Sequence, residues 1–198
     1  MSDILTISAS DLDSDGYYIG TSDVTNWNGS IEIERDLGTV KFKKSLRATG
    51  RIFAASITGI EAGDGIEAGT GIKAGWGIKA GWGIKAGAGI EAGDGIEAGD
   101  GIKAGWDIEA GAGIEAGDGI EAGDGIKAGT GIEAGDGIKA GTGIEAGLTI
   151  SAKSISARLR IFAGLCSWKI PTHEEMQIIG EVLSGTIAFG EHVKEKSE

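Results

Sequence analysis

Two histidines and one cysteine are the side chains in this sequence that most often carry acid–base or nucleophilic chemistry. His173, His192 and Cys166 all lie beyond residue 163, outside the regular part of the chain. A lone cysteine usually behaves as a small apolar residue, and one thiol forms neither an intramolecular disulfide nor a zinc cage of several thiolates. Each histidine is expected on the surface or at a helix end. The sequence therefore predicts a protein that is not an enzyme and that binds no metal or cofactor.

Carboxylates on alternate residues near the N-terminus have the spacing that begins a calcium-binding loop. Asp11, Asp13 and Asp15 are followed by Gly16 at the sixth place, where such a loop has its glycine. The twelfth place, where the loop needs a bidentate glutamate, holds Ser22. We therefore predict a polar turn for this segment.

A six-residue repeat occupies the middle of the chain, from residue 60 to residue 147. Ala follows two residues after each isoleucine of the repeat, Gly follows that Ala, and a second Gly precedes nearly every Ile, with Asp107 as the exception. Fifteen units in register indicate a repeat architecture. The isoleucines are Ile60, Ile66, Ile72, Ile78, Ile84, Ile90, Ile96, Ile102, Ile108, Ile114, Ile120, Ile126, Ile132, Ile138 and Ile144.

Each unit reads as a very short strand followed by a corner. Ile and Ala two residues apart point to the same side of an extended segment, and the Glu or Lys between them points to solvent. The Gly-x-Gly triplet is expected to form the corner, where glycine can adopt a positive φ. Because one three-residue strand buries too little to persist, the coils must stack on one another. The chain is therefore predicted to be an all-β protein, a β-solenoid (β-helix) of hexapeptide repeats.

The number of hexapeptides in each coil has two solutions. Two hexapeptides per coil, 12 residues, make opposite charges alternate up one face, from Glu67 through Lys79 and Glu91 to Lys103. Three per coil, 18 residues, give the triangular left-handed β-helix. That family usually has a small residue two places before the aliphatic one, where this chain has Asp64, Trp76 and Trp82. The 12-residue coil is therefore favoured, and it predicts about seven coils and a length of about 35 Å.

Three regions are expected along the chain. Residues 1–29 form an N-terminal cap or irregular segment, residues 30–163 form the solenoid with its regular repeat at 60–147, and residues 164–198 form a tail. In the tail, Thr172 and Glu175 have the spacing of a helix capping box. Apolar residues at helical spacing follow, so we predict an α-helix over 173–184 and a short extended piece over 186–189. The tail either caps the solenoid or binds a second copy of the chain as a homodimer.

Charge is concentrated in the repeat. The chain has a net charge of −12, of which residues 60–147 carry −10. Basic residues flank the repeat on both sides. On a 12-residue coil the repeat carries one carboxylate per about 2.2 Å, against one charge per about 1.7 Å of duplex DNA, so it is a diluted mimic of nucleic acid. The flanking basic residues are Lys41, Lys43, Lys44, Arg47 and Arg51 before the repeat, and Lys153, Arg158 and Arg160 after it.

Aromatic and acidic residues at the corners are the candidate binding residues. Trp76, Trp82 and Trp106 stand at corner positions beside Lys73, Lys79 and Lys103, and exposed tryptophans near charge are typical of interfaces. The alternative is that each indole covers the glycine-rich backbone of its neighbour. The candidate binding set is Trp76, Trp82, Trp106, Asp94, Asp100, Asp118, Asp124 and Asp136.

In period and composition the repeat resembles the glycine-rich hexapeptide β-solenoids. Enzymes of that architecture are usually acyltransferases that use a histidine between coils, and the repeat contains no histidine. The acidic repeat also resembles, as an architecture, the inhibitor repeat proteins of phages and mobile elements, including anti-CRISPR and gyrase-binding proteins. That resemblance implies a protein partner with a basic surface, normally a nucleic-acid-binding protein, and no direct binding to nucleic acid.

Two other functions remain open from the sequence. The first is a structural part of a phage fibre or needle. The second is ice binding by a flat face, for which only Thr70, Thr130 and Thr142 stand at repeat corners. The sequence has neither a signal peptide nor an apolar run of about 18 residues, so a cytoplasmic location is expected, the host cytoplasm if the protein comes from a phage.

Overall fold

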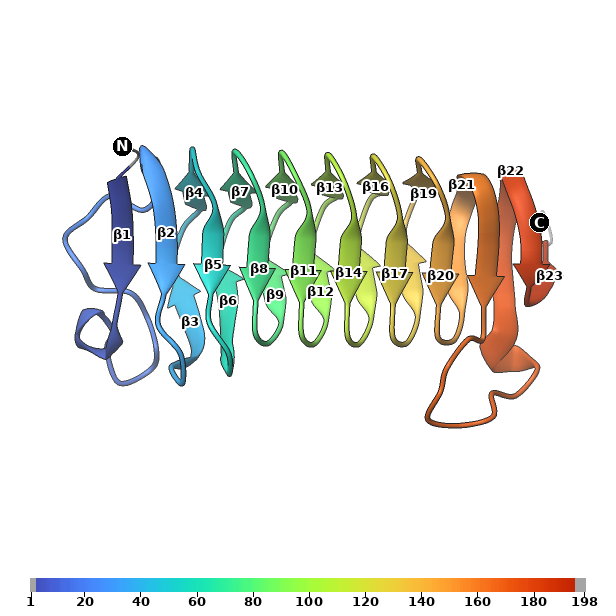
Figure 1. Ribbon diagram of the computed structural model, residues 1–198, viewed down its shortest axis with the longest axis horizontal. Coiled ribbons are helices and arrows are strands. Elements are labelled where there is room, and N and C mark those ends of the chain that lie inside the picture. The colour runs from blue at the N-terminus through green and yellow to red at the C-terminus, as the bar shows by residue number, and fades with distance from the viewer. Residues whose placement is uncertain (1–2, 195–198) are drawn as a thin grey trace.

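The protein is a straight rod of stacked parallel coils. The computed structural model describes residues 3–194, and Figure 1 shows strands stacked side by side along the whole rod, with the two termini at opposite ends. Two single 3₁₀ turns are the only helical elements in the described part of the chain. The prediction of an all-β solenoid is therefore confirmed.

One coil contains eighteen residues. Ile84 pairs with Ile66 on one side and with Ile102 on the other, and this spacing of 18 is kept throughout the regular repeat. The favoured 12-residue coil is wrong, and the triangular alternative describes the rod. The 88 residues of the repeat therefore make about five coils, about 24 Å long rather than about 35 Å.

The coil has three faces, which we name A, B and C in chain order. Figure 1 shows face C toward the viewer. Face A contains β3 (Gly38–Phe42), β6 (Thr58–Ala62), β9 (Ile78–Ala80), β12 (Ile96–Ala98), β15 (Ile114–Ala116) and β18 (Ile132–Ala134). Face B contains β4 (Leu46–Ala48), β7 (Ile66–Ala68), β10 (Ile84–Ala86), β13 (Ile102–Ala104), β16 (Ile120–Ala122) and β19 (Gly137–Ala140). Face C contains β1 (Asp3–Ile7), β2 (Gly29–Ile33), β5 (Ile52–Ala54), β8 (Ile72–Ala74), β11 (Ile90–Ala92), β14 (Ile108–Ala110), β17 (Ile126–Ala128) and β20 (Ile144–Ala146).

The core consists of three ladders of isoleucine and alanine. Every repeat isoleucine and every repeat alanine is buried, and the residue between them faces solvent. Each ladder buries identical side chains directly above one another, so a strand of three residues is held by the strands on both sides of it. The inward set predicted from the repeat is confirmed.

The corner glycines serve a purpose different from the one predicted. No glycine of the repeat has a positive φ. The glycine that follows Ala lies so close to the previous coil that a Cβ on Gly99 would sit 2.0 Å from the carbonyl oxygen of Gly81. The glycine that precedes Ile is less crowded: a Cβ on Gly101 would sit 3.1 Å from the carbonyl oxygen of Gly119. The repeat needs glycine for close contact between coils, and Asp107 occupies a site of the roomier kind.

The N-terminal end of the rod is covered. β1 adds a last strand to face C, and residues 8–28 then cross the end of the core, with a 3₁₀ turn, η1 (Ala9–Asp11), near their start. Leu12, Tyr18, Val24 and Trp27 pack against the core from this segment. The predicted polar turn is also present, because the Asp13 carboxylate accepts hydrogen bonds from the backbone N–H groups of Asp15 and Tyr17.

The C-terminal end is built from strands, and the predicted helix over 173–184 is wrong. β21 (Ile150–Ala163) and β22 (Gln177–Phe189) each run across faces A, B and C, and β23 (Glu191–Val193) adds one more strand on face A. The Thr172–Glu175 contact does form, but it starts only the single 3₁₀ turn η2 (Glu174–Met176). The following residues are rich in β-branched side chains and pair with the edge of β21 instead.

No helix within residues 3–194 is long and apolar enough to cross a membrane.

Candidate functional site

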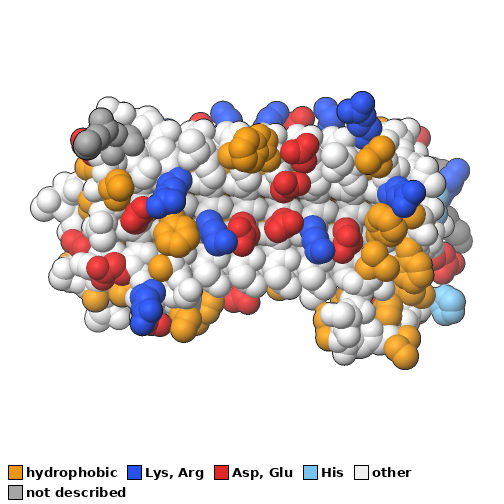
Figure 2. All heavy atoms as spheres, in the orientation of Figure 1, with side chains coloured by type: hydrophobic (Ala, Val, Ile, Leu, Met, Phe, Trp, Pro, Cys, Tyr) orange, Lys and Arg blue, Asp and Glu red, His pale blue; other side chains and the backbone are white. Residues whose placement is uncertain are grey.

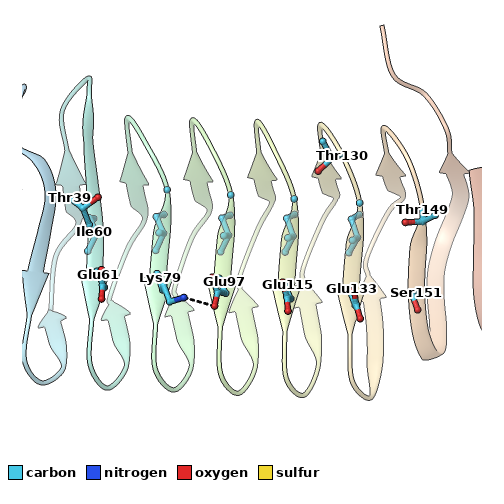
Figure 3. Close-up of a pocket in the computed structure, with 18 residues that line it drawn as sticks. Thr39, Ile60, Glu61, Lys79, Glu97, Glu115, Thr130, Glu133, Thr149 and Ser151 are labelled. Atoms are coloured by element: carbon cyan, nitrogen blue, oxygen red, sulfur yellow. Dashed lines mark hydrogen bonds and ion pairs between the residues drawn. The ribbon is translucent and has the colours of Figure 1, made fainter. Parts of the chain in front are cut away.

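Face A carries a row of carboxylates. In Figure 3, Glu61, Lys79, Glu97, Glu115 and Glu133 follow one another along the rod, one from each coil, at the middle position of their strands. Lys79 Nζ donates to Glu97 Oε1 at 2.6 Å, and this contact raises the pKa of the lysine ammonium. The row borders a shallow groove of about 530 Å³, whose floor is the glycine backbone that leads into each strand. Four of the five side chains in this row are acidic.

A second acidic row runs along the corner between faces A and B. The corner residues stack directly, since the N–H of Asp118 donates to the carbonyl oxygen of Asp100 at 3.1 Å, and that of Asp136 donates to Asp118 at 2.9 Å. Asp64 and Trp82 occupy the same corner in the two preceding coils. Only two residues separate this row from the glutamates of face A within each coil, as Ala98 and Gly99 separate Glu97 from Asp100, so the two rows form one surface.

We call this surface the acidic face. Together with Asp94, on the other corner of face A, it contains nine carboxylates and Lys79, a net charge of −8 out of the −10 of the repeat. Within residues 3–194, only two of the nine carboxylates form ion pairs, Glu97 with Lys79 and Asp136 with Lys153 at 2.7 Å. Its carboxylates are those of Glu61, Asp64, Asp94, Glu97, Asp100, Glu115, Asp118, Glu133 and Asp136.

Faces B and C are close to neutral because their lysines are paired with glutamates. On face B, Glu121 accepts from Lys103 at 2.8 Å and also pairs with Lys139 at 3.4 Å. The hydrogen bond from Lys103 is the main reason that the pKa of Glu121 is lowered. On face C, seen in Figure 2, Lys73 pairs with Glu91 and Lys127 with Glu145. The remaining pair, Lys85 with Glu67, means that every lysine of the repeat contacts a glutamate one coil away.

The three tryptophans lie on three different corners. Trp76 and Trp82 belong to the same coil and stand on the two sides of face A, whereas Trp106 stands on the corner between faces B and C, one coil before Asp124. All three side chains are exposed, at 40 %, 57 % and 63 % respectively. Each indole therefore offers free surface to a partner, and whether it also lies over the glycine backbone of its neighbour stays open. Six of the eight candidate residues therefore border face A, and Trp106 and Asp124 do not.

His173, His192 and Cys166, the residues considered for catalysis or metal binding, each make a separate contact. His192 bonds through Nε2 to the carbonyl oxygen of Gly180 at 2.9 Å, and His173 Nδ1 lies 3.8 Å from Glu191. The Cys166 thiol donates to the carbonyl oxygen of Lys169. In the part of the chain from Asp3 to Lys194, no three His, Cys, Asp or Glu residues have an arrangement suited to a metal ion.

The corner threonines do not form a grid. Thr70 and Thr142 share the corner between faces B and C but stand four coils apart, and Thr130 lies on the corner between faces C and A. A flat face with regularly spaced threonines is therefore not present at these positions.

The acidic face was not recognised in the sequence. Its carboxylates coincide only when positions 18 residues apart are superposed, as with Glu97, Glu115 and Glu133. A spacing of 12 residues does not bring these carboxylates together, because it aligns Glu115 with Lys103 and Lys127 instead.

Comparison of the chain with protein families, with curated proteins and with solved structures gave no match.

Proposed function

We propose that the chain is a non-enzymatic binding protein whose acidic face binds the basic surface of a nucleic-acid-binding protein. The observation that carries this proposal is the concentration of unpaired carboxylates around face A. Three consecutive coils, from Asp94 to Asp136, carry seven carboxylates and no lysine on this surface. A basic partner would bring the positive charges that the protein itself does not supply there.

The charge density of this surface is closer to that of DNA than the density expected from the sequence, and it therefore supports nucleic-acid mimicry better. Seven carboxylates over three coils correspond to one per about 2 Å of rod, close to the one charge per about 1.7 Å of duplex DNA. The density expected for the 12-residue coil, one per about 2.2 Å, counted the carboxylates of all faces along the whole repeat, whereas this density is reached on one surface over three coils. A protein that reads DNA mainly through its phosphates recognises such an array by charge and spacing.

The shape of the face favours close approach. The groove beside the glutamate row has a glycine floor, so a partner can approach the backbone there. Trp76 and Trp82 flank this face on one coil, where exposed indoles can supply the apolar anchors that charge alone does not give. Electrostatic attraction would guide the encounter, and the tryptophans would hold the complex.

The architecture-level resemblance to phage and mobile-element inhibitors suggests a narrower version of this proposal. In that version the partner belongs to the host's nucleic-acid machinery or defence, as for anti-CRISPR proteins, and the protein acts in the host cytoplasm. The acidic face is the surface that such an inhibitor would place over a DNA- or RNA-binding groove.

The test neutralises carboxylates that form no ion pair within the described chain. A variant with Asp100→Asn, Glu115→Gln, Asp118→Asn and Glu133→Gln is immobilised and exposed to heparin-purified nucleic-acid-binding proteins of the source organism. We expect at least about tenfold weaker capture of the main partner than for the unchanged protein, about 1.4 kcal/mol. The capture by the unchanged protein should also weaken as salt is raised, because screening shortens the range of the attraction.

The control variant removes the same number of charges from other surfaces. Glu91→Gln, Glu109→Gln, Asp124→Asn and Glu145→Gln change the net charge equally but leave the acidic face intact. This variant should retain the partner. Equal loss in both variants would show that net charge rather than the acidic face causes binding, and it would overturn the proposal.

A further inference from the structure

The chain packs differently over the core at the two ends of the rod. At the N-terminal end, residues 8–28 cover the core, and Val24 is itself buried there. At the C-terminal end, the last inward-facing residues of faces B and C are Val182 and Ile187, and both remain partly exposed, whereas the isoleucines below them are buried. Apolar side chains are thus partly exposed at both ends, since Leu5 in β1 is also only partly buried. Within the described chain, however, an irregular segment packs on the core only at the N-terminal end.

The last coil also leaves strand edges unpaired. β23 pairs only with Gln177–Ile179, so the part of β22 that crosses faces B and C pairs with β21 on one side and with no strand of the described chain on the other. This segment, Glu181–Phe189, contains neither lysine nor proline, the residues that usually protect an open edge. Its Leu183 and Phe189 side chains are 62 % and 44 % exposed.

Charge restricts what can cover this edge. The positions that hold Glu or Lys in the repeat hold Ser151, Ser156 and Phe162 in β21, and residues 177–193 contain two carboxylates and no lysine or arginine. The sides of the rod repel another copy because the repeat carries −10. β21 also carries the exposed Arg158 and Arg160, one strand from the edge, so the last coils carry charges of both signs and far less net charge than the repeat. Figure 2 shows hydrophobic side chains gathered at this end of the rod.

We propose that the C-terminal end binds a second copy of the chain to form an end-to-end homodimer. The end of a coiled chain is a step, one strand higher on face A than on faces B and C. A second copy, turned about a two-fold axis perpendicular to the rod, continues this step. β23 of each copy then lies antiparallel beside the face B part of β22 of the other, and Thr186–Phe189 lies antiparallel beside its own copy.

This arrangement closes the assembly and doubles the rod. The two C-terminal ends form one isologous interface, which closes on itself and gives a dimer rather than a fibre. The N-terminal ends face outward, and the outer edge of β1, which pairs only with β2 among the described strands, stays unpaired in the dimer. The two-fold axis passes near the corner between faces A and B, where β23 ends. The aspartate rows of the two copies therefore lie on the same side of a rod of twice the length. The dimer does not depend on the proposed partner, and it can be tested with the protein alone.

The first experiment measures mass in solution. Light scattering and sedimentation should give twice the 20.1 kDa chain mass at micromolar concentration, with little dependence on salt. Leu183→Lys with Phe189→Lys, two exposed positions, should give a folded monomer by circular dichroism. Ile4→Lys, an equally exposed residue at the other end, should remain a dimer. A monomeric unchanged protein at millimolar concentration, or open-ended polymers, would overturn the proposal.

The second experiment tests the geometry. In a Cys166→Ser background, Ala188→Cys should form an intermolecular disulfide on mild oxidation, because residue 188 lies next to its own copy near the two-fold axis. Ser14→Cys, exposed at the N-terminal end of the rod, should not cross-link under the same conditions. Cross-linking through Ser14→Cys alone would show that the other end associates, and would sink the proposed interface.

Discussion

At the scale of single residues, the two glycines of each repeat unit are not equivalent. The sequence shows both in almost every unit and gives no reason to separate them, apart from Asp107. The structure separates them by the distance to the neighbouring coil. The glycine after Ala donates its N–H to an alanine carbonyl of the previous coil, as Gly99 does to Ala80 at 3.1 Å, and no Cβ fits beside that contact.

Replacing each kind of glycine should have different effects. Gly99→Ala should destabilise the protein by about 3 kcal/mol or more, because its Cβ meets the backbone oxygen of Gly81 and the coils must move apart. Gly101→Ala should stay within about 1 kcal/mol of the unchanged protein, since its Cβ, 3.1 Å from the carbonyl oxygen of Gly119, needs only a small shift of the next coil and the unfolded chain loses freedom. Urea denaturation measures both. Equal effects of the two substitutions would contradict the role assigned to close contact between coils.

At the scale of elements, the C-terminal strands show where sequence patterns mislead. Met176, Ile179, Val182 and Leu183 fit one face of a helix, and the Glu175 carboxylate before them does accept a hydrogen bond from the Thr172 N–H. The strand uses a different set, with Ile178 buried and Leu183 exposed. A local pattern cannot show that β21 offers an unpaired edge, and that edge decides the outcome.

Two neighbouring isoleucines distinguish the strand from the helix. Ile178→Ser should destabilise the C-terminal coil by about 3 kcal/mol, because Ile178 is fully buried in the last layer of the core. Ile179→Ser should cost about 1 kcal/mol or less, since this side chain lies on the outer side of the same strand. A helix with its apolar face inward predicts the reverse order. Thermal unfolding followed by circular dichroism gives the ranking.

At the scale of the whole molecule, the repeat determined which residues lie inside but not how many units close a coil. Any multiple of six residues keeps isoleucine above isoleucine, so the packing of the core is the same for coils of 12 and of 18 residues. The solvent-facing charges are divided: Glu67, Lys79, Glu91 and Lys103 alternate at a spacing of 12, whereas Lys139 fits a spacing of 18. Twelve residues away it meets only Lys127 and Ser151, whereas 18 residues away it pairs with Glu121. The coil length then decides which carboxylates share a face, and thus where binding is proposed.

The most direct test of this account is the formation of a disulfide between corner residues 18 apart. In a Cys166→Ser background, Asp100→Cys with Asp118→Cys places two thiols on adjacent coils of one corner, with Cα atoms about 5 Å apart, within disulfide reach. Asp100→Cys with Ala112→Cys, 12 residues apart, places them on different corners. We predict rapid intramolecular oxidation of the first pair and none of the second. Oxidation of the second pair alone would contradict the 18-residue coil and the acidic face built on it.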